Sequence, residues 1–334
     1  MANNSVKNID STIYHNVEDL FTVIGASEEN IEKLTSAPYS YWRETFKQLI
    51  KKPLAILSVF VIFLILFFTI FGPMIKSYNV IDDPLTGSIA DRFSDVPYQS
   101  WTKDHWFGIG GNKMQFYRYL DLWTAVWIGA RLSLILGTVV ALIDTFLGIL
   151  IGSLWGYFRR LDPIMIEIRN FVNNVPSLLL YFLLMNFLEP NFWTIVFLLT
   201  MFGWIGLAGF IRNQIIIIRN RDYNIASVTL GSSPKAMITH NLLPYLISVI
   251  VTVISTAIPA AVSSEVGLAF FGLSFSAASG DITLGQVLTD ATRDEWMAYP
   301  YLLIAPMMVL VPLTVTFFYL GLALADATDP KNHR

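Results

Sequence analysis

The amino-acid sequence predicts an all-α polytopic membrane protein with six transmembrane helices and both termini in the cytoplasm. Three observations lead to this prediction. Of the 334 residues, 54% are hydrophobic and only 14% are charged, whereas about 25% of the residues in a soluble domain are charged. The hydrophobic residues gather in six long stretches. Each is near or above the length of roughly 20 residues that a membrane-spanning helix needs. Lys and Arg residues concentrate at alternate connections between these stretches.

The six stretches differ in length. They cover residues 54–71, 129–158, 164–188, 192–218, 245–271 and 301–324. We expect the second stretch to be bounded by Arg131 and by the Arg159–Arg160 pair. The second stretch would be about 45 Å long at about 1.5 Å per residue, so we expect it to tilt or to extend past the membrane. The first stretch begins too far along the chain for a cleaved secretory signal, so we interpret it as a retained membrane anchor.

These stretches divide the chain into five parts. The predicted parts are a cytoplasmic tail at 1–52, the first span at 53–72, an extracellular segment at 73–125, a core at 126–326 with the other five spans, and a cytoplasmic end at 327–334.

Positive charge gives the predicted orientation. Lys47, Lys51 and Lys52 precede the first stretch, and Arg159 and Arg160 follow the second. The connection after the third stretch contains neither Lys nor Arg. Because cytoplasmic connections carry an excess of Lys and Arg, we expect both ends of the chain to lie inside the cell.

Several classes of active site are absent from the sequence. There is no Cys residue, so disulfides and thiolate metal sites are excluded. No phosphate-binding loop motif occurs, and no two His residues have the i, i+4 spacing of a zinc-binding helix. The net charge of −3 gives no reason to expect a nucleic-acid partner. We therefore predict a non-catalytic protein without a cofactor of its own.

The loop at 219–244 carries clear signals for the starts and ends of helices. Asp222 is expected to cap a first short helix, and Gly231 suits the left-handed position that ends it. Ser233 is expected to cap a second helix, with Pro234 at its first position, and Pro244 marks the start of the fifth span. The loop is thus predicted to form a helix–glycine–helix unit, residues 222–244, which we call the knob.

The composition of the knob suits contact with another protein. Ala226, Ser227 and Gly231 are small and would let a partner approach the backbone, while Tyr223, Ile225 and Leu230 offer apolar contacts. A short helix of this kind can dock into a groove on a partner. The alternative is an ordinary loop with a surface helix.

The knob resembles the signature of binding-protein-dependent ABC transporter permeases, in which Glu-Ala-Ala is followed after three residues by Gly and later by an apolar pair and Pro. Ile225, Ala226 and Ser227 occupy the opening positions, so Ile225 replaces the family's Glu. Gly231 has the family spacing, and Leu242-Leu243-Pro244 matches the closing positions. Five further segments resemble the C-type permeases of oligopeptide importers, at residues 105–108, 129–134, 175–180, 265–272 and 326–330.

This resemblance implies the type I fold of ABC importer permeases and a role as one half of a translocation pore. It implies as partners a second permease subunit, two cytoplasmic ATPase subunits that bind the ATP, and an extracellular lipid-anchored peptide-binding protein. Contacts to the ATPases are expected at Tyr223, Ile225, Ala226, Ser227, Leu230, Gly231, Leu242 and Pro244. The alternatives are an importer of dipeptides or nickel, a secondary transporter or channel, and a membrane-embedded enzyme.

Two acidic residues are expected at membrane depth, where ionisable groups are costly and often functional. Asp144 lies near the middle of the second stretch and could face a pore or form a buried hydrogen bond between helices. Glu265 matches a family acid, and we expect a role in gating or subunit packing. In the second stretch, glycines at 148, 152 and 156 share one helix face. This pattern favours close helix packing, either within the chain or against the second permease.

Overall fold

The computed structural model describes residues 41–75, 100–103, 105–109, 121–274, 282–293 and 296–328. Most of the predicted tail 1–52, of the predicted extracellular segment 73–125 and of the predicted end 327–334 lies outside the described residues. The described residues are helical apart from connecting turns and an isolated bridge between Ile109 and Asp121.

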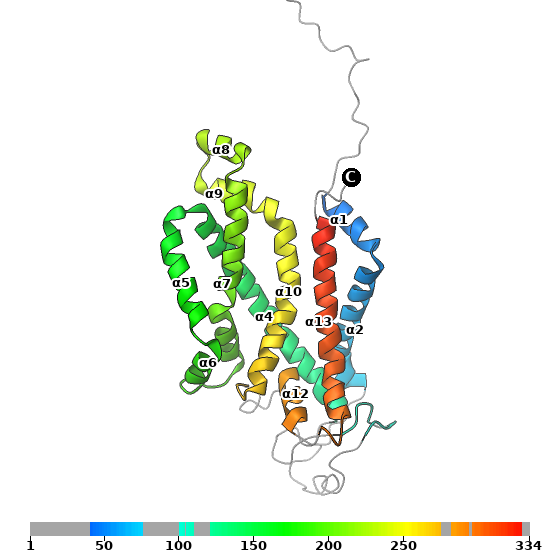
Figure 1. The fold of residues 1–334 in the computed structure, drawn as a ribbon. Helices are drawn as coiled ribbons and strands as arrows, with labels where there is room; N and C mark the ends of the chain where they lie inside the picture. Colours follow the sequence, from blue (N-terminus) through cyan, green and yellow to red (C-terminus); the bar gives the residue numbers. More distant parts are fainter. Residues whose placement is uncertain are drawn as a thin grey trace, which may run out of the picture. The chain divides into compact units, whose positions relative to one another are not determined.

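Five helical segments are long and apolar enough to cross a membrane, and Figure 1 shows them running side by side. They are α2 (Pro53–Ile75), α4 (Leu122–Tyr157), α7 (Phe192–Arg219), the segment Pro234–Phe270 that ends in α10 (Ile247–Phe270), and α13 (Tyr301–Thr328). They match five of the six stretches in the sequence. The prediction of a multi-pass helical membrane protein is therefore confirmed.

The third stretch does not form the single continuous helix that was predicted for residues 164–188. It forms α5 (Asp162–Asn174) and α6 (Ser177–Met185), which are separated at Val175 and Pro176. Proline lacks a backbone N–H and forces the preceding residue out of the helical conformation, and Val175 accordingly has an extended backbone with φ −87° and ψ 122°. In Figure 1, α5 and α6 follow one another beside α7.

The second span begins earlier than predicted, at Leu122 instead of residue 129. The carboxyl group of Asp121 caps this end by accepting a hydrogen bond from the backbone N–H of Trp123 at 2.9 Å. Arg131, which was expected to bound the span, lies inside α4. Its guanidinium donates to the carbonyls of Thr69 at 2.8 Å and Ile70 at 3.1 Å, so it satisfies carbonyl groups in the last turns of α2.

The glycine face of α4 packs against α7. Of the two alternatives for this face, packing within the chain is therefore the one observed. A Cβ atom added at Gly152 would lie 2.6 Å from the carbonyl oxygen of Ala208, and one at Gly156 would lie 2.7 Å from the Cβ of Ile215. Such small residues allow two membrane helices to approach closely and gain van der Waals contact. We conclude that α4 and α7 form one tightly packed pair.

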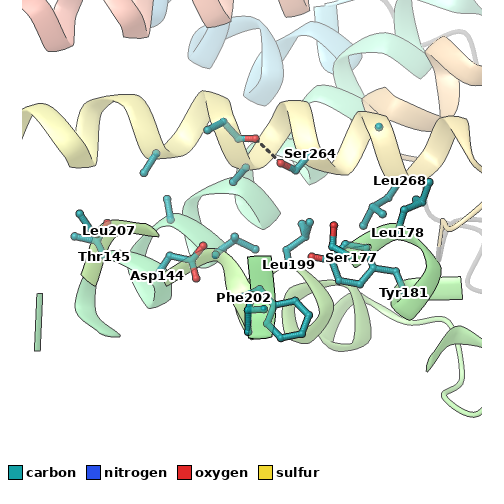
Figure 2. A pocket seen from close by; sticks show the side chains of 18 of the residues that line it. Asp144, Thr145, Ser177, Leu178, Tyr181, Leu199, Phe202, Leu207, Ser264 and Leu268 are labelled. Carbon is teal, nitrogen blue, oxygen red and sulfur yellow. Dashed lines mark hydrogen bonds between the residues drawn. The ribbon is translucent and has the colours of Figure 1, made fainter. Parts of the chain in front are cut away.

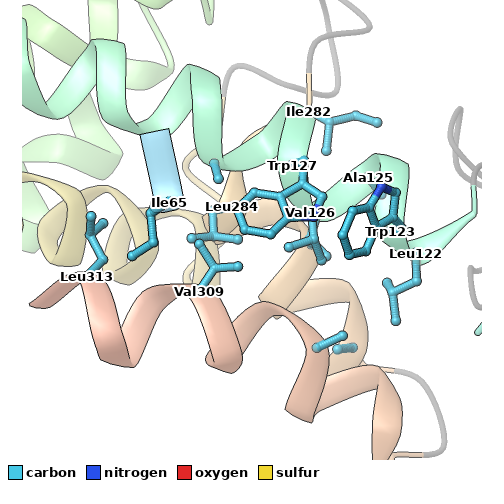
Figure 3. Packing of buried hydrophobic residues seen from close by; sticks show 14 of the residues in the cluster. Ile65, Leu122, Trp123, Ala125, Val126, Trp127, Ile282, Leu284, Val309 and Leu313 are labelled. Carbon is cyan, nitrogen blue, oxygen red and sulfur yellow. The ribbon is translucent and has the colours of Figure 1, made fainter. Parts of the chain in front are cut away.

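A second packed region joins α2, α4 and α13 to a short helix, α12 (Leu284–Arg293). Figure 3 shows Trp127 and Leu284 of this cluster near Val309 of α13, with Trp123 further along α4. The ring of Trp127 stacks on Phe68 of α2 with 5.1 Å between centroids. Aromatic pairs of this geometry contribute about 0.5–1.5 kcal/mol beyond burial alone. The cluster therefore holds α12, α2 and α13 against α4.

The chain between α4 and α5 forms a short 3-10 turn, η3 (Arg159–Leu161), and α1 (Tyr41–Ile50) precedes α2. Figure 1 places α1 and η3 at the same end of the helices as α8 (Asp222–Thr229) and α9 (Pro234–Ala236), whereas α12 lies at the opposite end.

Candidate functional site

The knob begins with α8, which ends at a glycine in the left-handed conformation. Gly231 has φ +89°, a value that L residues with a side chain rarely adopt. Its N–H donates to the carbonyl of Val228 at 3.0 Å, and the N–H of Ser232 donates to the carbonyl of Ser227 at 3.1 Å. This pair of bonds is the Schellman motif, and the prediction for Gly231 is confirmed.

The second half of the knob runs from α9 through η4 (Met237–Leu242) and η5 (Pro244–Leu246) into α10. The hydroxyl of Ser233 accepts a hydrogen bond from the N–H of Ala236 at 3.3 Å, and Pro234 is the first residue of α9. Both predictions are confirmed. The predicted cap at Asp222 is wrong, because Asp222 is already the first helical residue and Arg221 occupies the capping position without a side-chain bond. Placing Asp222 at the positive end of the helix dipole still stabilises α8.

Most of the predicted contact residues of the knob are exposed. Tyr223, Ile225 and Ala226 are exposed on α8, and Leu230 is 88% exposed. No atom lies within 4 Å of a Cβ added at Gly231. A helix with apolar side chains on its open face is suited to docking on a partner surface.

Leu242 differs from the other predicted contact residues, because it is completely buried. It packs with Ile211, Ile215 and Leu246 in a cluster between α7 and the start of α10. Ser227 is partly buried and Pro244 is exposed. Leu242 can therefore support the knob, but it offers no surface to another protein.

Asn224 holds the knob to α7 and was not predicted from the sequence. Its side chain is fully buried and donates to the carbonyl of Ile218 at 2.9 Å. The side-chain amide of Asn241 donates in turn to Asn224 at 3.2 Å. The inverted pattern of α8, with a polar residue inside and apolar residues outside, is the signal that could have identified it.

Basic side chains at the end of α7 link the knob to neighbouring helices. Arg219 donates from its Nη1 to the carbonyls of Gly156 at 3.0 Å and Tyr157 at 2.7 Å, at the end of α4. The guanidinium of Arg221 lies 5.2 Å from the ring centroid of Tyr245, beside α10. A displacement of the knob would therefore act on α4, α7 and α10 together.

Asp144 lies in the wall of a cavity of about 910 Å³ that is lined by residues of α4, α5, α6, α7 and α10. Figure 2 shows Asp144 and Thr145 on one side of this cavity and Ser177 and Tyr181 on another. The Oδ1 atom of Asp144 is buried and has no hydrogen-bond partner among the described residues. The structure therefore favours the cavity-facing alternative for Asp144 over a carboxyl hydrogen-bonded between helices.

Glu265 is placed elsewhere, at the point where α10 meets the start of α12, and is 3% exposed. Its carboxyl group accepts hydrogen bonds from the hydroxyl of Ser133 at 2.8 Å, from the hydroxyl of Thr283 and from the backbone N–H of Gly285. Ser133 also accepts from the N–H of Leu284 at 2.9 Å. Two N–H groups in the first turn of α12 are thus satisfied by side chains of α4 and α10, as a helix N-terminus requires.

The two segments that contribute this network approach closely because they contain glycine. A Cβ atom added at Gly129 would lie 2.9 Å from the backbone of Thr283 and Leu284, and one at Gly285 would lie 2.8 Å from the carboxyl oxygen of Glu265. Asp144 and Glu265 therefore belong to two separate sites. Within the described part of the chain, no group of three His, Asp or Glu side chains could hold a metal ion.

The chain was compared with known protein families. Residues 145–333 match the model of the binding-protein-dependent transport system inner membrane component. Residues 40–88 match the model of the N-terminal TM domain of oligopeptide transport permease C. The first match covers more than half of the chain. The chain belongs to this permease family.

Individual relatives agree with the family assignment of the permease. The oligopeptide transport system permease protein AmiD of Streptococcus pneumoniae is 32% identical over 303 residues, which cover 91% of this chain and 94% of that protein. The dipeptide transport system permease protein DppC of Bacillus subtilis is 32% identical over 88% of this chain and 87% of its own. The oligopeptide transport system permease protein OppC of Bacillus subtilis is 29% identical over 94% of this chain and 97% of that protein.

The family match includes the parts of the permease that the geometry singles out. Residues 145–333 contain α7, the whole knob, α10 with Glu265, and α12 and α13. Asp144 lies directly before the matched segment, and the match of residues 40–88 contains α1 and α2. The permease is thus a multi-pass plasma membrane protein of the oligopeptide permease type.

Proposed function

We propose that this permease forms one half of the translocation pore of an ATP-driven oligopeptide importer and couples that pore to cytoplasmic ATPases. The observation that carries the proposal is the knob, whose exposed apolar face is held rigidly by Asn224 and the Schellman motif. Two of the three relatives described above are named as oligopeptide permeases.

The proposed topology has six crossings and both termini in the cytoplasm. In it, α5 and α6 together make the third crossing in spite of the break at Pro176. The first crossing takes residues 53–72, the tail 1–52 and the end 327–334 lie inside, the segment 73–125 lies outside, and the type I permease core takes residues 126–326. The supporting observation is that α1, η3 and the knob lie at one end of the helices (Figure 1) and carry basic residues there.

The complete importer would contain a second permease, two cytoplasmic ATPase subunits and an extracellular lipid-anchored peptide-binding protein. In this proposal ATP is bound and hydrolysed by the ATPase subunits. Residues Tyr223, Ile225, Ala226, Leu230 and Gly231 form the contact face of the knob. Ser227, which is partly buried, and Pro244, which is exposed, lie beside this contact face. Leu242 supports the knob by packing against α7.

Closure of the ATPases would displace the knob and change which side of the membrane the pore faces. Each bound ligand shifts this equilibrium only by its different affinity for the two states. The cavity at Asp144 is proposed as this chain's share of the solute path, and Glu265 as the group that holds α12 in place near the outer end of that path.

An uptake assay tests the role of the knob. Gly231→Arg and Ala226→Arg place a long charged side chain on the contact face, and Gly231→Arg also requires a strained backbone. Uptake of a labelled oligopeptide and co-purification of the ATPase subunits should both be lost, while the amount of permease in the membrane remains near normal. Glu189→Arg, at an exposed position outside the knob, is the control and should leave both unchanged.

Normal uptake in Gly231→Arg and Ala226→Arg would remove the knob from the mechanism. Transport that persists without ATPase subunits would instead favour a secondary transporter or channel. A dipeptide importer is the second candidate, because the dipeptide permease of Bacillus subtilis is as similar as the pneumococcal protein. Competition between labelled oligopeptides and unlabelled dipeptides or Ni²⁺ distinguishes these cargoes.

A further inference from the structure

The cavity at Asp144 has the dimensions of a ligand site. Its volume of about 910 Å³ lies within the range of roughly 300–1,000 Å³ that is common for small-molecule sites. It is bounded by five helices, and three of them continue into or pack beneath the knob: α4, α7 and α10. A group bound in this cavity would therefore contact the helices that the proposed coupling moves.

Five hydroxyl side chains line the cavity, and two of them, Thr256 and Ser264, are already used within their own helix. Ser264 donates to the carbonyl of Ala260 at 2.9 Å, as Figure 2 shows, and Thr256 donates to the carbonyl of Thr252 at 3.3 Å. Asp144 differs, because its buried Oδ1 has no partner among the described residues, and the hydroxyl of the adjacent Thr145 has none either. Among the described residues, the only acidic group that lines the cavity is thus Asp144, with the hydroxyl side chains of Ser177 and Tyr181 on another side.

The wall of the cavity contains no Lys, Arg or His residue. On the same helices, Arg212 pairs with Asp162 at 2.7 Å and Arg131 donates to carbonyls of α2, and Arg169 of α5 lies beside Gly209 without lining the cavity. An ionised carboxyl group at membrane depth is costly unless a cation pairs with it. The described lining of the cavity therefore offers no positive charge to Asp144, and a cationic ligand would supply one.

We infer that Asp144 binds the ammonium group of a lysine side chain in the transported peptide as it passes through the cavity, an inference that rests on the proposed import function. A carboxylate offers acceptors only, and an ammonium group offers three donors and a compact positive charge. The site selects for charge, and the apolar remainder of the wall tolerates varied side chains.

The test compares two peptides in the complete importer, with the second permease, ATPases and binding protein reconstituted in vesicles. The peptides are Ala-Ala-Lys-Ala-Ala and the same sequence with uncharged norleucine in place of lysine. Capture of each peptide by the purified binding protein is measured separately and used to correct the rates. In the wild type the corrected uptake ratio should favour the lysine peptide, and Asp144→Asn should lower this ratio about fivefold to tenfold.

Ser264→Ala is the matched control, because Ser264 lines the same cavity with a hydroxyl that is bonded to its own helix. It should leave the ratio unchanged. Asp144→Ser provides a second uncharged variant if Asp144→Asn does not reach the membrane. An unchanged ratio with uptake retained, or equal loss of both peptides, would overturn the inference and leave the import function standing. Failure of the wild type to take up either peptide in the presence of ATP would instead overturn the proposed function.

Discussion

Replacing Glu265 by alanine removes the acceptor that holds the first turn of α12 to α4 and α10. Three donors lose their partner, namely the hydroxyls of Ser133 and Thr283 and the N–H of Gly285. A buried donor without a partner costs about 1–3 kcal/mol. Because the two hydroxyls can rotate, we take about 1 kcal/mol for each donor, which gives about 3 kcal/mol in favour of the detached state of α12.

This free energy is large enough to measure by amide hydrogen exchange. A change of about 3 kcal/mol raises the opening equilibrium about 150-fold, so the amides of α12 should exchange about 100-fold faster in purified Glu265→Ala permease. Glu265→Gln keeps one acceptor oxygen and should show an increase of only about fivefold, corresponding to about 1 kcal/mol. Ser264→Ala is the control, because the hydroxyl of Ser264, next to Glu265 in the chain, bonds only to the carbonyl of Ala260 within α10.

Two results would refute this reasoning. Exchange of α12 within about twofold of the wild type in Glu265→Ala would mean that the hydrophobic cluster alone holds the helix. An equal increase throughout α13 would mean that the substitution unfolds the outer helices together, so that no separate docking of α12 exists.

Three further predictions follow from other contacts. Gly152→Leu places a side chain against the carbonyl of Ala208 and should lower the thermal midpoint of the purified permease by several degrees, since overpacking costs about 1–3 kcal/mol; an unchanged midpoint would contradict the close α4–α7 contact. Asn224→Ala removes the side-chain donor to the carbonyl of Ile218 and the acceptor of Asn241 and should increase protease cleavage in the knob and weaken ATPase co-purification. Thr239→Ala, whose hydroxyl bonds within its own turn, should do neither. Arg131→Met exposes the last carbonyls of α2 and should accelerate amide exchange there, and equal exchange would show that these bonds add nothing.

Features set by the local backbone could be predicted from the sequence. Gly231 was assigned to a left-handed position and Ser233 to a cap because each depends on only a few neighbouring residues. Five of the six spans were predicted because hydrophobic stretches of sufficient length leave few alternatives in a membrane. The prediction of one continuous helix over residues 164–188 was wrong, because the overall apolar character of that stretch was given more weight than Pro176, which breaks the helix.

Features set by distant contacts could not be predicted. Glu265 was recognised as unusual, but its partner Ser133 lies 132 positions away in the chain. The burial of Leu242 and Asn224 depends on how the knob folds back on α7. The start of α4 was missed because Arg131 was interpreted as a boundary, whereas the carbonyls of another helix accept its hydrogen bonds.

The arrangement of these contacts explains how a small surface unit can act on a distant cavity. Arg219 connects the base of the knob to the last carbonyls of α4, and the glycines at 152 and 156 of α4 lie close against α7. The knob continues through η4 and η5 directly into α10. Since α4, α7 and α10 also form much of the wall around Asp144, a movement of the knob cannot be absorbed locally in a closely packed interior. It must change the shape of the cavity, and this is the property that an importer driven by external ATPases requires.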